Sequence, residues 1–268
     1  MMKVGVLGAN GRMGHALVRA VSESPSLELM GVIDGPSSTR EGADAGESIG
    51  LGTLGVKVTK QLSTVIGNLD VLIDFSSPAA TVAAAQLCAE HGVKMVIGTT
   101  GFSAEQEQAV QEVAKTIAMV KATNMSVGVN LTFKLAQMAA KALGDTVDVE
   151  IVEAHHRHKV DSPSGTALTL GQGIARELGR DLDDVALYGR EGQMGARDRQ
   201  TIGFSTIRGG DVVGEHTAMF IGDGERIEIT HRSNSRDNYA NGSVRACEWL
   251  EGKLCGCFDM IDVLDLNN

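Results

Sequence analysis

The chain has 268 residues, of which 43% are hydrophobic. A chain of this length can bury a sizeable core, and we expect either two domains or one domain with a large insertion. Its 24 Lys and Arg residues are outnumbered by 34 Asp and Glu residues, which gives a formal net charge of −10. This charge repels nucleic acid and anionic membrane surfaces, so we expect neither as a partner, and any anionic ligand must bind at a local site.

The N-terminal sequence MMKVGVLGAN runs directly into an apolar, strand-like segment, without a charged leader or a cleavage site. No stretch approaches the roughly 18 to 20 uninterrupted apolar residues of a membrane span. These features predict a cytoplasmic protein. The cysteines form neither a disulfide framework nor a paired metal-binding motif, and we expect packing thiols at Cys88, Cys247, Cys255 and Cys257.

The first 126 residues alternate apolar strand-like runs with amphipathic helical runs, the pattern of βαβ units around a parallel sheet. We expect helices over residues 12–24, from Pro78 and from Ser103, where Gln106 completes a capping box. The predicted strands are residues 3–8, 27–34, 70–77, 94–101 and 118–124.

The pattern then changes to that of a second, α+β domain. A helix over 129–144 and a strand over 147–156 precede a further helix from Thr166. From residue 201, three strand-like runs separated by Gly-Asp and Asp-Gly turn signals predict an antiparallel meander. The polar, Gly-rich segment 188–200 is expected to be a mobile loop.

The closing segments, NYANGSVRACEWLEG and FDMIDVLDL, are predicted to be a helix and a strand. We expect both to return to the first domain and to pack on it. The chain would then cross twice between the domains, at a hinge.

Three glycines in the sequence GANGRMG, Gly8, Gly11 and Gly14, follow a strand and open a helix. This spacing is related to the dinucleotide fingerprint, whose glycines allow a tight turn and close approach of the backbone to a phosphate. The free N–H groups at the start of a helix favour a pyrophosphate there. The triplet alone is a weak signal, and an ordinary Gly-rich turn is the alternative.

Asp34 strengthens the nucleotide hypothesis, because it ends the second strand twenty residues after Gly14. An acid there can accept both hydroxyls of an adenosine ribose. A neighbouring Arg would accommodate a 2′-phosphate, but the neighbour is Gly35, and only Arg12 and Arg40 lie nearby in the sequence. We therefore favour NADH over NADPH, with both open. Two further strand ends, Gly98-Thr99-Thr100 and Ala122-Thr123-Asn124-Met125, are candidates for the nicotinamide end.

The sequence EAHHRHKVDSPSGTA, residues 153–167, concentrates basic side chains in an acidic chain. Such a run can be a solvated face or a metal site. If the preceding strand continues, however, His155 points to one side while His156 and His158 point to the other, so the three imidazoles do not converge on one ion. We expect no metal.

Ser-Gly-Thr after Pro163 lies immediately before a helical run and is therefore a helix N-terminus that can hold a carboxylate. Lys159 adds a positive charge, His156 a second donor, and a histidine can exchange a proton at neutral pH. This set fits a small dianion better than a single carboxylate. Asp161 could orient the Lys or a His, or cap the turn, and we favour the cap.

These motifs, together with VIGTTGF, NMSVGVN, TIGFSTIRGGDVVGEHTAMF and FDMIDVLDLNN, closely resemble the 4-hydroxy-tetrahydrodipicolinate reductase (dihydrodipicolinate reductase) family of lysine biosynthesis. The resemblance covers essentially the whole chain. It implies an α/β protein with an N-terminal Rossmann dinucleotide-binding domain, residues 1–126 plus 236–268. It also implies an α+β substrate-binding and oligomerisation domain, residues 127–235, with a mixed, largely antiparallel sheet that builds a homotetramer.

The activity that the resemblance implies is the reduction, by NADH or NADPH, of (2S,4S)-4-hydroxy-2,3,4,5-tetrahydrodipicolinate to 2,3,4,5-tetrahydrodipicolinate with loss of water. His155 would be the proton donor and acceptor, and Lys159 a proton donor and substrate clamp. His156 would contact the substrate, while the Gly165 and Thr166 amides hold a carboxylate. The dinucleotide would contact Gly8, Ala9, Asn10, Gly11, Arg12, Met13, Asp34, Gly98, Thr99, Thr100, Ala122, Thr123, Asn124 and Met125.

One departure concerns the cofactor: many members carry Glu-Arg where this chain has Asp34-Gly35, and that Arg reads the 2′-phosphate. Two alternatives to this function stay open. One is another two-domain nicotinamide dehydrogenase, acting on aspartate semialdehyde or homoserine. The other is a redox-sensing protein that binds NADH without turnover.

Overall fold

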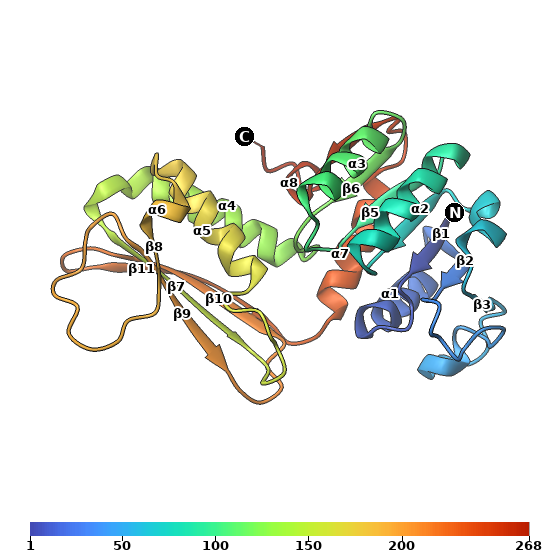
Figure 1. Ribbon diagram of the computed structural model, residues 1–268, viewed down its shortest axis with the longest axis horizontal. Helices are drawn as coiled ribbons and strands as arrows, with labels where there is room; N and C mark the ends of the chain where they lie inside the picture. The colour runs from blue at the N-terminus through green and yellow to red at the C-terminus, as the bar shows by residue number, and fades with distance from the viewer. Residues whose placement is uncertain (268) are drawn as a thin grey trace. The chain divides into compact units, whose positions relative to one another are not determined.

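The computed structural model describes residues 1–267 and consists of two compact units (Figure 1). Unit 1 is formed by residues 1–127 and 236–268, and unit 2 by residues 128–235. Asn268, the last residue of the expected dinucleotide-binding range, lies outside the described residues. Each unit buries its own apolar core.

Within residues 1–267, unit 1 contains a seven-stranded, wholly parallel sheet in the order β12-β6-β5-β4-β1-β2-β3. Its central strands are buried on both faces, as parallel sheets between helices must be. The strands are β1 (Met2–Leu7), β2 (Leu27–Ile33), β3 (Val58–Thr59), β4 (Val71–Asp74), β5 (Lys94–Ile97), β6 (Ala118–Lys121) and β12 (Gly256–Phe258).

Helices cover both faces of this sheet, because successive strand residues point to opposite sides. Ile73 packs in the core beneath α1 (Arg12–Glu23) and α7 (Asp237–Trp249), whereas Leu72 packs beneath α2 (Pro78–His91) and α3 (Ala104–Ala114). Pro78 occupies the first turn of α2, and Ser103 and Gln106 form the predicted capping box of α3. The prediction of a doubly wound α/β fold is confirmed. Short 3₁₀ helices, η1 (Glu47–Ile49), η2 (Leu62–Thr64) and η3 (Ile66–Asn68), complete the connections.

The C-terminal segment returns to unit 1 as expected, because β12 pairs in parallel with β6. The predicted strand over FDMIDVLDL is wrong. After Phe258 the chain forms a short helix, α8 (Met260–Val263), which Asp259 begins by accepting the backbone N–H groups of Ile261 and Asp262. The expectation for the cysteines is also partly wrong, since Cys255 precedes β12 and is exposed.

Unit 2 packs helices against one face of a second sheet (Figure 1). Strand β7 (Asp148–His155) lies in its centre and alternates strictly between half-buried and buried residues, so one face meets the helices. The helical segments are α4 (Val127–Leu143), η4 (Gly144–Thr146), α5 (Gly165–Glu177) and α6 (Leu182–Val185). The other strands are β8 (Ala186–Tyr188), β9 (Ile202–Arg208), β10 (Gly214–Ile221) and β11 (Arg226–Ser233).

The predicted meander of three consecutive antiparallel strands is wrong, although the mixed sheet is confirmed. Strands β10 and β11 form an antiparallel hairpin, but β9 does not pair with β10. Instead β7 lies between them, antiparallel to β10 and parallel to β9, which in turn pairs in parallel with β8. Turn signals show where the chain reverses, but pairing is decided by which strand has a matching apolar face.

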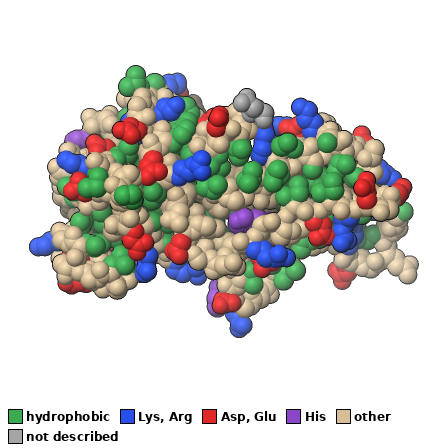
Figure 2. All heavy atoms as spheres, turned by 180° about the vertical axis from the view of Figure 1, so that it is seen from behind, with side chains coloured by type: hydrophobic (Ala, Val, Ile, Leu, Met, Phe, Trp, Pro, Cys, Tyr) green, Lys and Arg blue, Asp and Glu red, His purple; other side chains and the backbone are tan. Residues whose placement is uncertain are grey.

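The surface carries charges of both signs. On the face shown in Figure 2, Lys and Arg side chains are interspersed with Asp and Glu side chains and with hydrophobic ones. Within residues 1–267, none of the helices has the length and apolarity that a membrane crossing requires.

Candidate active site

The glycine turn of unit 1 fits a dinucleotide phosphate. Gly8 has φ +84°, and a Cβ there would lie 2.4 Å from the Phe75 carbonyl oxygen. A Cβ at Gly14 would lie 2.4 Å from the Ala9 Cα, so the turn and α1 pack backbone to backbone. Helix α1 begins after Gly11 with neither a side-chain cap nor an acidic residue in its first turn. Its N-terminus is therefore available to an anion.

Asp34, at the end of β2, is 2% exposed and is already engaged by protein groups. Its carboxylate accepts hydrogen bonds from Ser38 Oγ at 2.7 Å and from the Arg40 guanidinium at 3.0 to 3.2 Å. Arg40 also donates to Ser48 Oγ. The structure therefore adds a cation, Arg40, at the strand end where Asp34 was predicted to meet a ribose. Gly35 is exposed, and a Cβ there would meet nothing within 4 Å.

The two predicted nicotinamide segments follow neighbouring parallel strands, β5 and β6, and so lie side by side. The Ala122 N–H donates to the Ile97 carbonyl, which joins them directly. Gly98 is pressed against the Phe75 ring, since a Cβ would come within 2.2 Å of it. Met125 is buried in the core, so only its backbone can face a ligand.

The sequence interpretation missed Asp74, the last residue of β4, which lies at this same edge of the sheet. It is completely buried, accepts from Ser76 Oγ at 2.5 Å, and contacts Thr99 Oγ1 at 3.4 Å. Burial raises the pKa of Asp74, while its hydrogen bonds with Ser76 and Thr81 oppose the shift. A carboxylate that ends an otherwise apolar strand is the signal that could have pointed to it.

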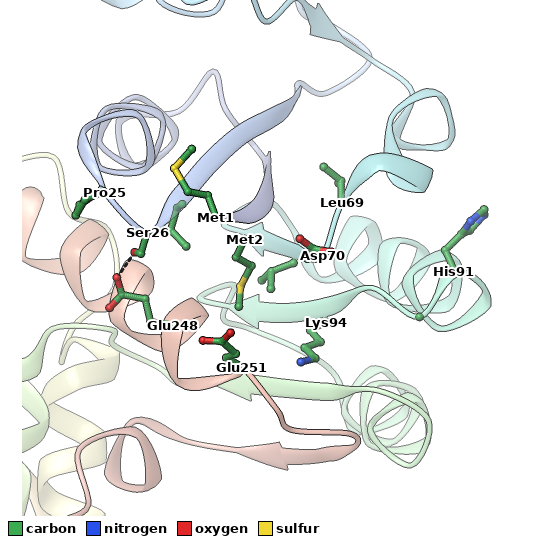
Figure 3. Close-up of a pocket in the computed structure, with 13 residues that line it drawn as sticks. Met1, Met2, Pro25, Ser26, Leu69, Asp70, His91, Lys94, Glu248 and Glu251 are labelled. Atoms are coloured by element: carbon green, nitrogen blue, oxygen red, sulfur yellow. Dashed lines mark hydrogen bonds between the residues drawn. The ribbon is translucent and has the colours of Figure 1, made fainter.

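A pocket of about 730 Å³ also lies in unit 1 (Figure 3). It is at the opposite, N-terminal ends of β1, β2, β4 and β5, beside the end of α7. Its polar lining includes Ser26, Asp70, Lys94, Glu248 and Glu251, and the Ser26 hydroxyl donates to Glu248. None of the predicted site residues lines it, so this pocket is separate from the nucleotide edge.

In unit 2, the basic run leaves the strand earlier than predicted. Strand β7 ends at His155, and the chain turns, with the Lys159 N–H donating to the His156 carbonyl. The strand does not continue through the basic run, so the alternation that a continued strand would impose does not apply. Arg157 and His158 lie in an exposed turn, and the His156 and His158 rings are 6.2 Å apart. Among the described residues, no group of three His, Cys, Asp or Glu side chains is arranged to hold a metal ion.

His155 is buried and held by a carboxylate that the sequence interpretation did not name. Its Nδ1 lies 2.6 Å from Oε2 of Glu153, two residues earlier on the same face of β7. Arg208, at the end of β9, forms a fork with both oxygens of Glu153, each at 2.8 Å. Although burial opposes it, the hydrogen bonds from His155 and Arg208 lower the pKa of Glu153 to about 2. The i, i+2 spacing in a strand was the available signal for Glu153.

The N-terminus of α5 lies against the same group. Ser164 is the N-cap, because its Oγ accepts the Ala167 N–H at 3.2 Å, and its own N–H donates to Glu153 Oε1 at 3.1 Å. Gly165 and Thr166 are the first two residues of the helix, so both lie where its dipole favours an anion. Asp161 pairs with Lys159 at 2.8 Å, so it orients the lysine. Although burial opposes it, hydrogen bonds from Lys159 and from the Gly165 backbone N–H lower the pKa of Asp161, so it also caps the turn before α5.

A second histidine, His216 of β10, completes the arrangement and was not predicted from the sequence. Its Nε2 lies 3.0 Å from Ser164 Oγ, and its ring stands edge-on to that of His155, with centroids 5.1 Å apart. Burial, followed by the nearby His155, lowers the pKa of His216 to about 3. It is therefore neutral at physiological pH. Unit 2 thus presents one imidazole with a fixed partner, a lysine and a helix N-terminus, a set that can bind an anion and exchange a proton.

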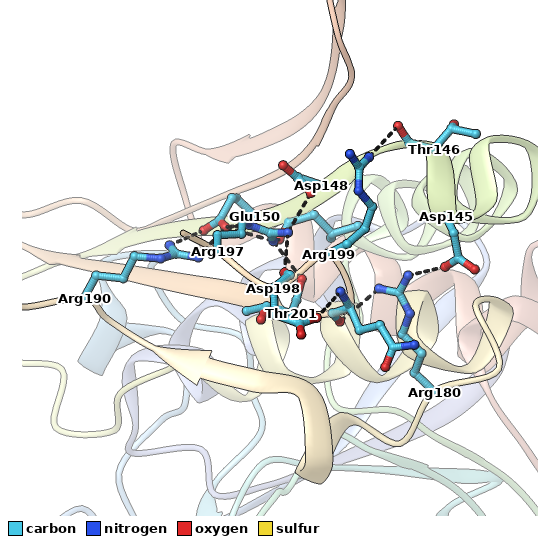
Figure 4. A network of polar contacts seen from close by, with 12 residues as sticks. Asp145, Thr146, Asp148, Glu150, Arg180, Arg190, Arg197, Asp198, Arg199 and Thr201 are labelled. Atoms are coloured by element: carbon cyan, nitrogen blue, oxygen red, sulfur yellow. Dashed lines mark hydrogen bonds and ion pairs between the residues drawn. The ribbon is translucent and has the colours of Figure 1, made fainter. Parts of the chain in front are cut away.

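The loop that was expected to be mobile is tied to β7 by ion pairs (Figure 4). Arg190 and Arg197 both bind Glu150, at 2.8 and 3.1 Å, and Arg197 also binds Asp148 at 2.8 Å. Glu150 lies on the face of β7 opposite to Glu153, so this cluster is separate from the histidine site.

Three features define the class of protein: a doubly wound sheet with a glycine turn, an acid at the end of the second strand, and a separate α+β unit. This class is the two-domain, nicotinamide-nucleotide-dependent oxidoreductases. Comparison with known proteins narrows this class. Residues 2–125 match the family model described as "Dihydrodipicolinate reductase, N-terminus", and residues 128–264 match "Dihydrodipicolinate reductase, C-terminus". The chain belongs to the dihydrodipicolinate reductase family.

Curated relatives agree with the family models. The chain is 57% identical over 266 residues to the 4-hydroxy-tetrahydrodipicolinate reductase of Acinetobacter baumannii strain AYE, covering 99% of this chain and 97% of that protein. The corresponding protein of strain ACICU is 55% identical over the same length.

Solved structures share the fold over nearly the whole chain. The dipicolinate-bound dihydrodipicolinate reductase from Paenisporosarcina sp. TG-14 has a TM-score of 0.76 at 25% identity, covering 98% of each chain. A probable dehydrogenase from Thermotoga maritima, at 12% identity and a TM-score of 0.65, covers 98% of this chain and 92% of its own. The second comparison shows the fold alone.

Proposed function

We propose that this protein reduces (2S,4S)-4-hydroxy-2,3,4,5-tetrahydrodipicolinate to (S)-2,3,4,5-tetrahydrodipicolinate, with loss of water, in the diaminopimelate route of lysine biosynthesis. Relatives named for this reaction, with 57% identity along 99% of the chain, support the proposal. The observation in the molecule that carries it is the buried His155, held by Glu153 beside the N-terminus of α5. That arrangement suits an anionic substrate that must exchange a proton.

The substrate has two carboxylates, and unit 2 has groups for such a molecule. We assign the Gly165 and Thr166 amides to one carboxylate, with Lys159 and His156 as further contacts. His155 is assigned the proton transfer, with Lys159 as a second proton donor. The relative solved with bound dipicolinate, a planar ring dicarboxylate, supports a small ring dianion as the ligand class.

NADH or NADPH would supply the hydride. We assign the pyrophosphate to the turn from Gly8 to Met13, the adenosine ribose to Asp34, and the nicotinamide end to the segments 98–100 and 122–125. NADH is the favoured cofactor, because the Arg40 guanidinium is already neutralised by Asp34 and residue 35 has no side chain to meet a 2′-phosphate. No group of this arrangement calls for a metal.

We further propose that the enzyme is a cytoplasmic homotetramer. The four cysteines, all within the described residues, are free thiols, which suits a reducing compartment. Ile207 pairs with Ala154 on the face of the unit 2 sheet that the helices leave open, and its side chain is 55% exposed there. An exposed apolar side chain on an open sheet face favours association between copies. Light scattering of the purified protein tests the assembly, and a monomer would contradict it.

One assay separates the proposal from its alternatives. NADH and NADPH absorbance is followed with and without the product of condensing pyruvate with aspartate semialdehyde, which is the substrate named above. The proposal predicts nucleotide oxidation only when this product is present. Oxidation with aspartate semialdehyde alone, or an equal reaction with homoserine and oxidised nucleotide, would favour another dehydrogenase. Nucleotide binding without turnover would favour a redox-sensing protein.

A further inference from the structure

Glu153 is a buried charge in the central strand of unit 2. Its residue is 1% exposed, and an isolated carboxylate in such a place is strongly unfavourable unless it is paired. Its partners come from β7, β9 and the N-terminus of α5: His155 Nδ1, both terminal nitrogens of Arg208, and the Ser164 N–H. Since so many groups converge on one side chain, the arrangement needs an explanation beyond the stability of the sheet.

These contacts fix the orientation of His155. An ionised carboxylate can only accept hydrogen bonds, so the Nδ1 that lies 2.6 Å away must carry its proton. The exchangeable position is then Nε2, which makes no hydrogen bond within the part of the chain that the structure describes. Arg208 keeps the carboxylate ionised, because its fork occupies both oxygens.

We propose that Glu153, clamped by Arg208, is the positioning residue for His155. It holds His155 with Nδ1 protonated and Nε2 directed to the substrate, and it aligns this histidine with the anion-binding end of α5. This inference rests on the proposed function, in which His155 transfers the proton. The alignment arises because Ser164, the N-cap of α5, donates its N–H to the same carboxylate. Errors of about 1 Å in such geometry reduce turnover strongly.

The charged and titratable groups around His155 lie on the neighbouring strands and on the turn after β7. Glu153 lies on β7, Arg208 on β9, and the ion pair of Lys159 with Asp161 lies in the turn after β7. His216 on β10 is buried and His231 on β11 is half-buried, and burial lowers the pKa of both imidazoles, so they add no charge at neutral pH. Glu153 is therefore the carboxylate in direct contact with the His155 ring.

The same strand offers a matched control. Glu150 also binds arginines, Arg190 and Arg197, but on the opposite face of β7 (Figure 4). Glu150→Gln removes a carboxylate from the same strand and breaks a comparable ion cluster without touching His155. An effect of general weakening of β7 would appear in both variants, whereas a positioning effect would appear only in Glu153→Gln.

The test combines a structural and a kinetic measurement on the full-length protein. In protein labelled with ¹⁵N at histidine, NMR should show His155 protonated on Nδ1 in the wild type and in Glu150→Gln, and a changed tautomer in Glu153→Gln. Retention of the wild-type tautomer in Glu153→Gln would overturn the proposal. This measurement needs no turnover, so failure of the proposed function cannot be mistaken for failure of the positioning role.

Kinetics provide the second readout. Glu153→Gln should lower kcat by about a hundredfold while substrate KM changes by less than about threefold, because general acid–base help is lost and the α5 end remains. Equal effects of Glu153→Gln and Glu150→Gln would assign Glu153 a merely structural role.

A milder variant keeps the proposal falsifiable if Glu153→Gln does not fold. Arg208→Lys retains the positive charge but loses the fork, so Glu153 can rotate away from His155. It should lower kcat by about tenfold with the His155 tautomer only partly retained. Wild-type kcat and tautomer in Arg208→Lys would contradict the clamp.

Discussion

Gly35→Arg tests the structural basis of cofactor preference. The position is exposed, its backbone does not need a positive φ, and a Cβ would meet nothing within 4 Å. The substitution therefore adds a guanidinium at the end of β2 without displacing any neighbour. The existing cation, Arg40, already forms an ion pair with Asp34 at 3.0 Å and a hydrogen bond with Ser48, so it attracts a second anion less strongly than an unpaired arginine would.

The expected gain in binding free energy for NADPH follows from the exposure of residue 35. Two unit charges about 4 Å apart gain roughly 1 kcal/mol in water and about 4 kcal/mol at an effective dielectric constant of 20. For an exposed arginine and a 2′-phosphate, after the loss of side-chain freedom, we expect about 1 to 2 kcal/mol. This corresponds to an increase of about fivefold to thirtyfold in kcat/KM for NADPH, with NADH changed by less than about twofold.

The assay is the ratio of kcat/KM for NADPH to that for NADH, measured at low ionic strength and again at high salt. Gly35→Ala is the matched control and should leave the ratio unchanged, because it adds a side chain without charge. High salt should reduce the gain in the Arg variant. An unchanged ratio in Gly35→Arg would refute the placement of the ribose at the end of β2.

Three further predictions concern the two units separately. Gly14→Ala places a methyl group 2.4 Å from the Ala9 Cα, so NADH affinity measured by calorimetry should fall at least about tenfold. Binding of pyridine-2,6-dicarboxylate to unit 2 should be unchanged, and an equal loss of both affinities would contradict separate sites. Ser164→Ala removes the α5 cap and the partner of His216, which together should cost about 2 to 3 kcal/mol and raise hydrogen exchange in α5; unchanged protection would refute the cap. His216 has a pKa of about 3 in the folded protein, below its ordinary value of 6.5, so the unfolded chain takes up a proton first and stability should fall from about pH 6.5 towards pH 3, by roughly 1.4 kcal/mol per unit. Urea unfolding across this range should show a weaker pH dependence in His216→Gln, and an identical slope would contradict the assignment.

Unit 1 was largely predictable from the sequence. Its strands are continuous apolar runs, its helices carry local signals such as the Ser103 capping box, and the glycine turn marks where the first helix begins. Such signals are local, so they survive without knowledge of the fold. Cys255 was expected to be a packing thiol but is exposed, because β12 begins only after it.

Unit 2 was less predictable because its site is built from distant segments. His155 and Lys159 stand in one motif, but Arg208 reaches Glu153 from 55 residues away and His216 reaches Ser164 from 52 residues away. Neither residue carries a local signal, since an arginine at a strand end and a histidine in an alternating strand are both ordinary. The partner of β9 was missed for the same reason: pairing depends on which apolar faces match after collapse.

Proton transfer is assigned to His155, and the steady-state kinetics of His155→Ala with 4-hydroxy-tetrahydrodipicolinate test this role most directly. The predicted result is a fall in kcat of about a hundredfold to ten-thousandfold, with a much smaller change in KM and with NADH binding intact. An unchanged kcat, or a variant that loses only substrate affinity, would contradict it.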